Sequence, residues 1–248
     1  MSNEQTIHVH EGAAGTHEVI HTDGHGNGHH HHKQSFITKY IFSQDHKTIG
    51  KQFLVTGIIW AIIGAFFSVV FRLQLGFPDS SFPFLEKIFG HWARGGKLDP
   101  EFYYALITMH GTILVFFVLT AGLSGTFANL LIPLQVGARD MASPFMNMLS
   151  YWFFFLASVI MMSYLFLQTG PASGGWTMYP PLSALHDAQP GSKAGADFWL
   201  IAMAMFIVSS LLGGLNYIAT ILNMRTKGMS MTRLPLKIWG LFFTADRK

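Results

Sequence analysis

The chain has 248 residues, of which half are hydrophobic and only 12% are charged, whereas a typical soluble domain has about a quarter charged residues. It contains no cysteine, which excludes disulfides, thiolate metal sites and cysteine nucleophiles within this sequence. The formal net charge of +3 is too small to indicate a nucleic-acid partner.

Residues 1–35 form a polar segment that holds nine of the thirteen histidines, including the run from His29 to His32. Large apolar residues are scarce there, so the composition predicts a disordered tail. The histidines could bind copper or nickel weakly, because imidazole suits both metals. The segment could equally be a solvated tail or an expression tag, since ligands on a flexible chain fix no coordination geometry.

Four stretches are long and apolar enough to be transmembrane helices, at about 53–71, 103–133, 145–168 and 198–223. No Lys, Arg, Asp or Glu occurs from 102 to 138 or from 141 to 185, as expected for helices surrounded by lipid. A last apolar stretch, 234–245, is too short to cross a bilayer and predicts the start of a fifth span. The predicted fold is an all-α polytopic transmembrane helix bundle over residues 36–248, preceded by the tail.

The basic residues predict how this bundle is oriented. Positive charges lie before the first span and after the fourth, at Lys33, Lys39, Lys47, Lys51, Arg225, Lys227, Arg233 and Lys237. An even number of spans puts both groups on one side, and the positive-inside rule makes that side cytoplasmic. The N-terminus is therefore expected in the cytoplasm, as is the short loop that contains Arg139 and Asp140.

His110 is the one histidine that falls inside a predicted span. An ionisable group at that depth is costly without a partner, and it indicates a functional site. A neutral imidazole could be an axial haem ligand, or it could hydrogen-bond a neighbouring helix. Tyr103 precedes it by almost two turns and shares its helix face. Arg72 closes the first span, either as an interfacial anchor or as a hydrogen-bond donor to a polar haem substituent.

A second candidate site lies at the opposite ends of the spans. Asn129 ends the second span, Asp140 lies in the short loop, and Asn147 opens the third span. A carboxylate with two amides at the mouth of a bundle could collect protons and pass them to ordered water. Asp140 with Ser143 and Pro144 also suits a plain turn and helix start. Since no nucleophile–base pair, paired carboxylates or phosphate loop is found, no catalytic residue is assigned.

Several of these segments resemble subunit I of the haem–copper oxidases. The run Asp45-His46-Lys47-Thr48-Ile49-Gly50 resembles the family's NHKDIG opening, and 53–72 resembles its first helix. Residues 108–147 resemble its second helix and following loop, 170–184 its outer loop, and 209–231 its fourth helix. The similarity is collinear from about residue 40 to 244, and the loops look closest to bacterial members of the Bacteroidetes type.

The resemblance implies a role for each candidate residue. His110 matches the first axial ligand of the low-spin haem, Arg72 the arginine that hydrogen-bonds the haem formyl group, and Tyr103 a tyrosine at the haem periphery. Asp140 matches the entrance carboxylate of the D-type proton channel. The asparagines at its mouth and two hydroxyls further along match Asn129, Asn147, Ser209 and Ser210.

The implied activity is that of a cytochrome-c oxidase of the bacterial inner membrane, which reduces dioxygen to water with electrons from a cytochrome c-type donor and translocates protons. Subunits II and III are the implied partners. The family's other haem ligands and its copper ligands lie on later helices, so the high-spin haem and copper belong to the complete subunit and this chain alone is expected to be inactive.

Two residues depart from the family pattern. Phe53 stands where many members have a tyrosine beside the proton path, and Gln74 stands where some have a glutamate at an outer metal site. The alternative to an oxidase is a haem-free membrane transport or structural subunit in which His110 and Asp140 form a proton relay.

Overall fold

The computed structural model describes residues 7–12, 16–22, 28–31, 36–167, 169–188 and 194–246. The chain divides into two compact units, Met1–Ser43 and Gln44–Lys248.

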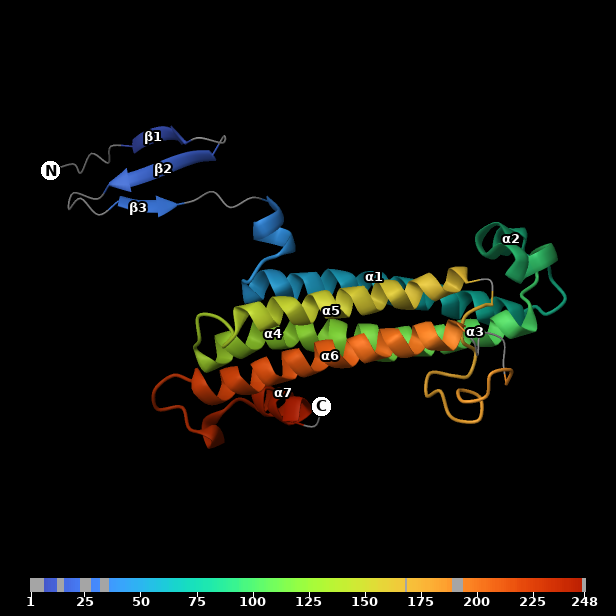
Figure 1. Cartoon of the computed structure of the whole chain (residues 1–248). Coiled ribbons are helices and arrows are strands. Elements are labelled where there is room, and N and C mark those ends of the chain that lie inside the picture. Colours follow the sequence, from blue (N-terminus) through green and yellow to red (C-terminus); the bar gives the residue numbers. More distant parts are fainter. Residues whose placement is uncertain are drawn as a thin grey trace. The chain divides into compact units, whose positions relative to one another are not determined.

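The N-terminal unit contains three short strands, β1 (Ile7–Gly12), β2 (Thr16–Thr22) and β3 (Gly28–His31), followed by a π-helix, η1 (Ile37–Ile41). The strands form an antiparallel sheet in the order β1-β2-β3, with Val9 opposite Val19 (Figure 1). The disordered tail expected for residues 1–35 stays a prediction. The β-branched residues of the first two strands favour extended backbone.

The second unit is the helix bundle, and it confirms the all-α fold predicted for this part of the chain. Four helices are long and apolar enough to cross a membrane: His46–Gly76, Pro100–Val136, Pro144–Phe166 and Ala194–Asn223. They run alongside one another in Figure 1. Each contains one of the four predicted spans almost entirely, and the first two extend several residues beyond them because the helical hydrogen bonding continues into the polar flanks.

The first, third and fourth spans consist mainly of α1 (His46–Gly76), α5 (Pro144–Ser163) and α6 (Ala194–Asn223). The second is a continuous rod of α3 (Pro100–Thr112), a π-helix η3 (Ile113–Leu123) and α4 (Ser124–Val136). The π-helix begins three residues after His110. Such segments often occur at functional sites, because their wider turns shift the faces of the helix that follows.

Short polar side chains begin three of these helices. Asp45 accepts a hydrogen bond from the Thr48 amide at 2.9 Å, and Asp99 accepts one from the Glu101 amide at 3.1 Å. Ser143 caps α5 with its hydroxyl oxygen, and Pro144 follows in the first turn. These caps satisfy amide groups that have no partner within their helices.

Glycines let the first two spans approach closely near the middle of the bundle. A Cβ atom on Gly57 would lie 3.0 Å from the Cα of Gly122, so neither position has room for a side chain. Buried aromatic rings fill the space beside this crossing, with Phe53 and Phe154 5.3 Å apart and Phe117 and Phe154 5.9 Å apart between centroids.

The connections contain shorter helices. The 76–100 connection folds into α2 (Pro83–Phe89) and a 3₁₀ segment η2 (Gly90–Gly96), and η4 (Tyr164–Phe166) ends the third span. After α6 come η5 (Met231–Arg233) and α7 (Leu236–Asp246), whose 11 residues are too few to cross a bilayer. The Ala245 region of α7 packs against Gly214 of α6.

Candidate functional site

The ring of His110 is held by the backbone of the neighbouring span. Its Nδ1 lies 2.8 Å from the carbonyl oxygen of Gly64 on α1, and a carbonyl can only accept, so Nδ1 carries the hydrogen. Nε2 makes no hydrogen bond to any residue within the described ranges. A neutral imidazole fixed in this way presents the Nε2 lone pair, which is the arrangement found in histidines that bind metals.

One aromatic side chain of α1, Phe71, packs against this imidazole. The ring of Phe71 lies edge-on to His110 at 5.4 Å and edge-on to Tyr103 at 6.2 Å between centroids. His110 and Tyr103 are half-buried, as expected from their shared helix face, whereas Arg72 is exposed at the end of α1. Arg72 has no ion pair or hydrogen bond to another described residue, so its guanidinium is free to bind a group outside this chain.

These residues fit a haem on chemical grounds. The donor is a single neutral nitrogen with its tautomer fixed, and the adjoining rings are apolar, as a porphyrin requires. An exposed arginine with free N–H groups could bind a polar substituent on the porphyrin edge.

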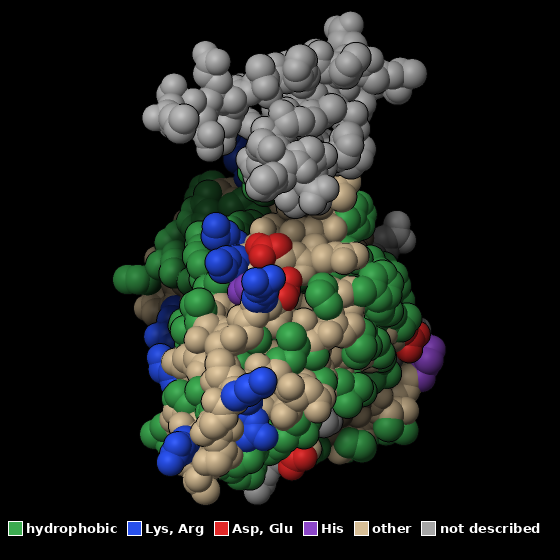
Figure 2. All heavy atoms as spheres, turned by 90° about the vertical axis from the view of Figure 1, so that its left-hand side faces the viewer, with side chains coloured by type: hydrophobic (Ala, Val, Ile, Leu, Met, Phe, Trp, Pro, Cys, Tyr) green, Lys and Arg blue, Asp and Glu red, His purple; other side chains and the backbone are tan. Residues whose placement is uncertain are grey.

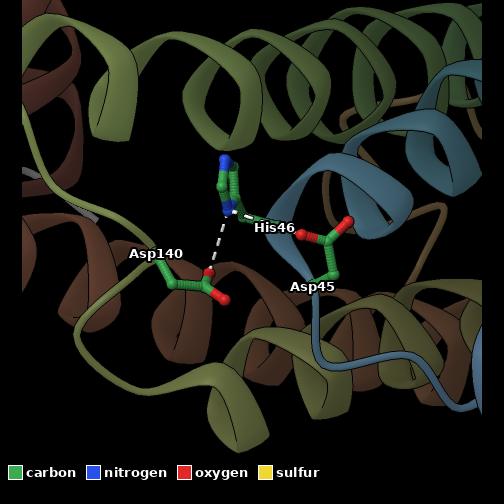
Figure 3. Close-up of side chains that lie close together, drawn as sticks. All are labelled: Asp45, His46 and Asp140. Carbon is green, nitrogen blue, oxygen red and sulfur yellow. Dashed lines mark hydrogen bonds and ion pairs between the residues drawn. The ribbon is translucent and has the colours of Figure 1, made fainter. Parts of the chain in front are cut away.

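Asp140 lies at the other end of the spans and pairs with a histidine from α1. Its Oδ1 accepts hydrogen bonds from Nδ1 of His46 at 3.1 Å and from the Met141 amide at 2.7 Å. The His46 side chain is buried, while about a third of the Asp140 side chain is exposed, at 34%. Figure 3 shows the imidazole between Asp140 and Asp45. The pair thus joins an accessible carboxylate to a buried imidazole.

Asp45, His46 and Asp140 each offer one ligand atom, and these atoms lie within 4.8 Å of one another. In the described part of the chain this is the one group of three such residues that could hold a metal ion. Asp45 is already engaged, because Oδ2 accepts from both the amide and the hydroxyl of Thr48 at 2.9 and 3.0 Å. Capping α1 explains this carboxylate without a metal.

The predicted asparagine pair meets inside the bundle. Asn129 and Asn147 are both fully buried, and the Asn147 amide group donates to the Asn129 side-chain oxygen. Beyond them, the Ser150 hydroxyl donates to the Asn147 carbonyl at 2.8 Å, and the Ser209 hydroxyl donates to the Ser150 carbonyl at 2.6 Å. Three of the polar residues predicted on separate helices are therefore brought onto one hydrogen-bonded line, and Ser210 lines the adjacent cavity.

The loop that carries Asp140 is fastened to α6. The amide of Ala142 donates to the Thr220 hydroxyl at 2.9 Å, and the amide of Ser143 donates to the Asn216 side-chain oxygen at 2.8 Å. Both acceptors are buried. The turn predicted from Ser143 and Pro144 is present, with Ser143 as the helix cap, and Asp140 is left to face His46.

Sequence reasoning missed the role of His46, which it used only as part of a motif. His46 and Asp140 are 94 positions apart, so no local pattern links them. The signal that would have found the pair is that two ionisable residues lie at the same predicted end of two neighbouring spans. It also missed the buried hydrogen bond of 3.1 Å between the Thr56 and Tyr151 hydroxyls, beside Phe53.

Gln74, where some oxidases have a glutamate, is used by the local backbone. Its side-chain oxygen accepts from the Leu98 amide at 3.0 Å, and this joins the end of α1 to the connection before α3. A neutral amide in this position acts as a structural link.

The end of the bundle that carries Asp140 is rich in basic side chains, as Figure 2 shows. The segments that meet there are the start of α1, the loop before α5 and the chain after α6 (Figure 1). Their basic residues are Lys47, Lys51, Arg139, Arg225, Lys227, Arg233 and Lys237, and their acidic residues are Asp45, Asp140 and Asp246.

Comparison with known proteins adds independent information. The sequence model of the family described as "Cytochrome C and Quinol oxidase polypeptide I" matches residues 48–245. The chain is 43% identical over 212 residues to alternative cytochrome c oxidase subunit 1 of Bradyrhizobium diazoefficiens. This aligned region covers 86% of this chain and 33% of that protein.

It is 36% identical over 234 residues to cytochrome c oxidase subunit 1 of Cereibacter sphaeroides, covering 88% of this chain and 40% of that protein. It is also 34% identical over 210 residues to the heme-copper oxidase subunit I+III of Aeropyrum pernix, covering 85% of this chain and 23% of that protein. The chain thus spans less than half the length of each of these relatives.

Proposed function

Because this chain belongs to the cytochrome c and quinol oxidase polypeptide I family, we propose that it supplies one face of the low-spin haem site and the entrance of a proton path in a respiratory terminal oxidase. It is a multi-pass membrane protein, with four helices suited to crossing a bilayer.

In the proposed haem site, His110 would hold the iron through Nε2, with the ring orientation set by the carbonyl of Gly64. Arg72 would bind a polar substituent of the haem, and the Tyr103 hydroxyl would offer a polar group beside it. When bound, the haem supplies one-electron chemistry, taking up an electron and passing it on. The residues of this chain fix its ligand and the field around it.

In the proposed proton path, Asp140 takes protons from cytoplasmic water, because its carboxylate is partly exposed at the basic end of the bundle. The imidazole of His46 holds this carboxylate in position. Asn129 and Asn147 carry the path inward, and the hydroxyls of Ser150, Ser209 and Ser210 continue it. Amides and hydroxyls can order water molecules along such a path without carrying charge themselves.

The whole enzyme in this proposal reduces dioxygen to water with electrons from a cytochrome c and translocates protons, in complex with subunits II and III. The fused subunit I+III relative supports a partner of the subunit III type. We also propose that the high-spin haem and copper belong to the complete subunit and that this chain alone does not reduce dioxygen.

The proposed location is a bacterial plasma membrane with the N-terminus in the cytoplasm. The basic end of the bundle supports this orientation by the positive-inside rule. Asp140 then faces the compartment from which protons are taken.

The observation that carries this proposal is the hydrogen bond from Nδ1 of His110 to Gly64, which leaves Nε2 for iron. The test is a pyridine haemochrome assay on the purified complex that contains this chain, with His110→Ala compared against His186→Ala. His186 is exposed in the outer connection and serves as the control. Loss of one haem in the first variant alone supports the proposal. A complex without haem would instead favour a transport subunit with a proton relay.

A further inference from the structure

A small cavity of about 20 Å³ lies among all four spans, and it is lined by Ser150, which donates a hydrogen bond to the Asn147 carbonyl. This volume is enough for one water molecule. Side chains from every span reach it, including the ring of Phe53 from α1 and that of Phe206 from α6. Six of its lining residues carry hydroxyl groups: Thr120, Ser124, Ser150, Ser209, Ser210 and Tyr217.

Tyr217 is the largest of these six residues, and it is buried at 5% exposure. Its hydroxyl makes no hydrogen bond to any residue that the structure describes. A Cβ atom placed on Gly213 would lie 3.5 Å from that hydroxyl and 3.9 Å from the hydroxyl of Ser150. Both hydroxyls therefore lie within 4 Å of the space beside this glycine. A buried hydroxyl without a protein partner is normally satisfied by an ordered water.

Three of the other five hydroxyls are oriented by hydrogen bonds that they already donate. Ser150 donates to the Asn147 carbonyl at 2.8 Å, Ser209 to the Ser150 carbonyl at 2.6 Å, and Thr120 to the Val115 carbonyl at 2.7 Å. Each therefore offers its oxygen lone pairs to the cavity as an acceptor. The phenol of Tyr217 adds an uncommitted donor, so a water in the cavity would find partners of both kinds.

We propose that Tyr217 is a proton-relay residue, which joins the line from Asn129 and Asn147 to the hydroxyls deeper in the cavity through one water molecule. This inference rests on the proposed function. The water takes up a proton from the path and gives one to the phenol oxygen; the phenol releases its own proton to the hydroxyl oxygen of Ser124 or Ser210, and that hydroxyl passes its own proton on. The phenol thus ends neutral, and one proton has moved along the path.

The test measures proton uptake by the oxidase complex that contains this chain, with a pH-indicator dye in stopped flow after the reduced complex is mixed with oxygen. Tyr217→Phe removes only the hydroxyl. We expect uptake to slow at least about tenfold, because positioned proton-transfer groups contribute that much or more. The haem content and melting temperature are expected to match those of the wild type.

Tyr164→Phe is the matched control. Tyr164 is fully buried, and its hydroxyl also lacks a partner among the described residues, but it does not line this cavity. We expect it to leave proton uptake unchanged.

Gly213→Ala provides a second variant that keeps the phenol. Its new methyl group would stand at ordinary contact distance, 3.5 Å from the Tyr217 hydroxyl, and would take the place of the water. We expect the same slowing as in Tyr217→Phe. This variant decides the question if Tyr217→Phe does not assemble.

Phe53→Tyr in the Tyr217→Phe background tests rescue, because Phe53 lines the same cavity and would return a phenol to it. Recovered uptake supports the relay. Wild-type uptake in Tyr217→Phe or in Gly213→Ala, with normal haem content, overturns it. If the wild-type complex itself holds no haem, the proposed function fails. If it holds haem and takes up protons while either variant matches it, only the relay fails.

Discussion

His110 at one end of the bundle has a single hydrogen bond, to a backbone carbonyl, whereas Asp140 at the other end has two donors from this chain itself. The first arrangement leaves a nitrogen lone pair for a group outside the chain. The second is made within the chain, between Asp140, the His46 imidazole and the Met141 amide, and the next residues of the loop are held to α6. Under the proposed function, the His110 end awaits a ligand from outside the chain, whereas folding alone already holds the Asp140 carboxylate in place.

The largest expected effect is at the Asp140 end. Asp140→Asn keeps an oxygen for the Met141 amide but removes the group that can carry a proton. We expect proton uptake by the oxidase complex to fall on the order of 100-fold, because a positioned proton-transfer group contributes about 10²–10⁴. A stopped-flow measurement with a pH-indicator dye reads this directly.

Asp187→Asn is the control for that experiment. Asp187 also pairs with a histidine, His186 at 3.3 Å, but both side chains are exposed in the outer connection. Equal losses of uptake in the two variants would show that Asp140 has no special place in the path.

A substitution at the crossing of the first two spans tests whether this contact stabilises the bundle between the His110 end and the Asp140 end. Gly57→Ala would place a Cβ atom 3.0 Å from the Gly122 backbone, which cannot move aside as a side chain can. We expect a loss of about 1–3 kcal/mol in stability, because overpacking a dense core costs that much. The helices should also shift at both the His110 end and the Asp140 end. Thermal unfolding in detergent measures the loss of stability.

Gly76→Ala is the matched control on the same helix, because nothing lies within 4 Å of the new methyl group. If both variants have the melting temperature of the wild type, the close crossing of the first two spans contributes nothing to the stability of the bundle.

The smallest expected effect is that of His46→Gln, which exchanges an imidazole for an amide beside Asp140. We expect a loss of about 1 kcal/mol in stability, because Asp140 is a third exposed and water replaces part of the lost hydrogen bond. His186→Gln, in the exposed pair, is expected to change the melting temperature by less. A larger effect from His186→Gln would show that the His46–Asp140 hydrogen bond does not stabilise the fold.

Much of the fold followed from hydropathy, because lipid allows only helices whose backbone groups are satisfied internally. The start of α5 was also readable, from Ser143 and Pro144. The π-helix over Ile113–Leu123 was not, since its residues are uniformly apolar and carry no signal for a wider turn. The three strands of the N-terminal unit were not predicted, because the polarity of that segment outweighs a few Ile and Val residues.

The site was predicted residue by residue, but its contacts were not. Depth in the membrane singled out His110, and loop position singled out Asp140. The partner of His110 is a backbone carbonyl, which no sequence pattern distinguishes from any other. The cavity lined by Ser150 and Tyr217 depends on how the four spans pack together. The unpartnered hydroxyl of Tyr217 therefore became visible only in the structure.

The most direct test of the His110 end is replacement of the proposed haem ligand from solution. In His110→Gly the space left by the imidazole can admit free imidazole, so the low-spin haem spectrum of the oxidase complex should be lost and then return when imidazole is added. A low-spin spectrum that survives in His110→Gly without imidazole would show that the iron takes its ligand elsewhere.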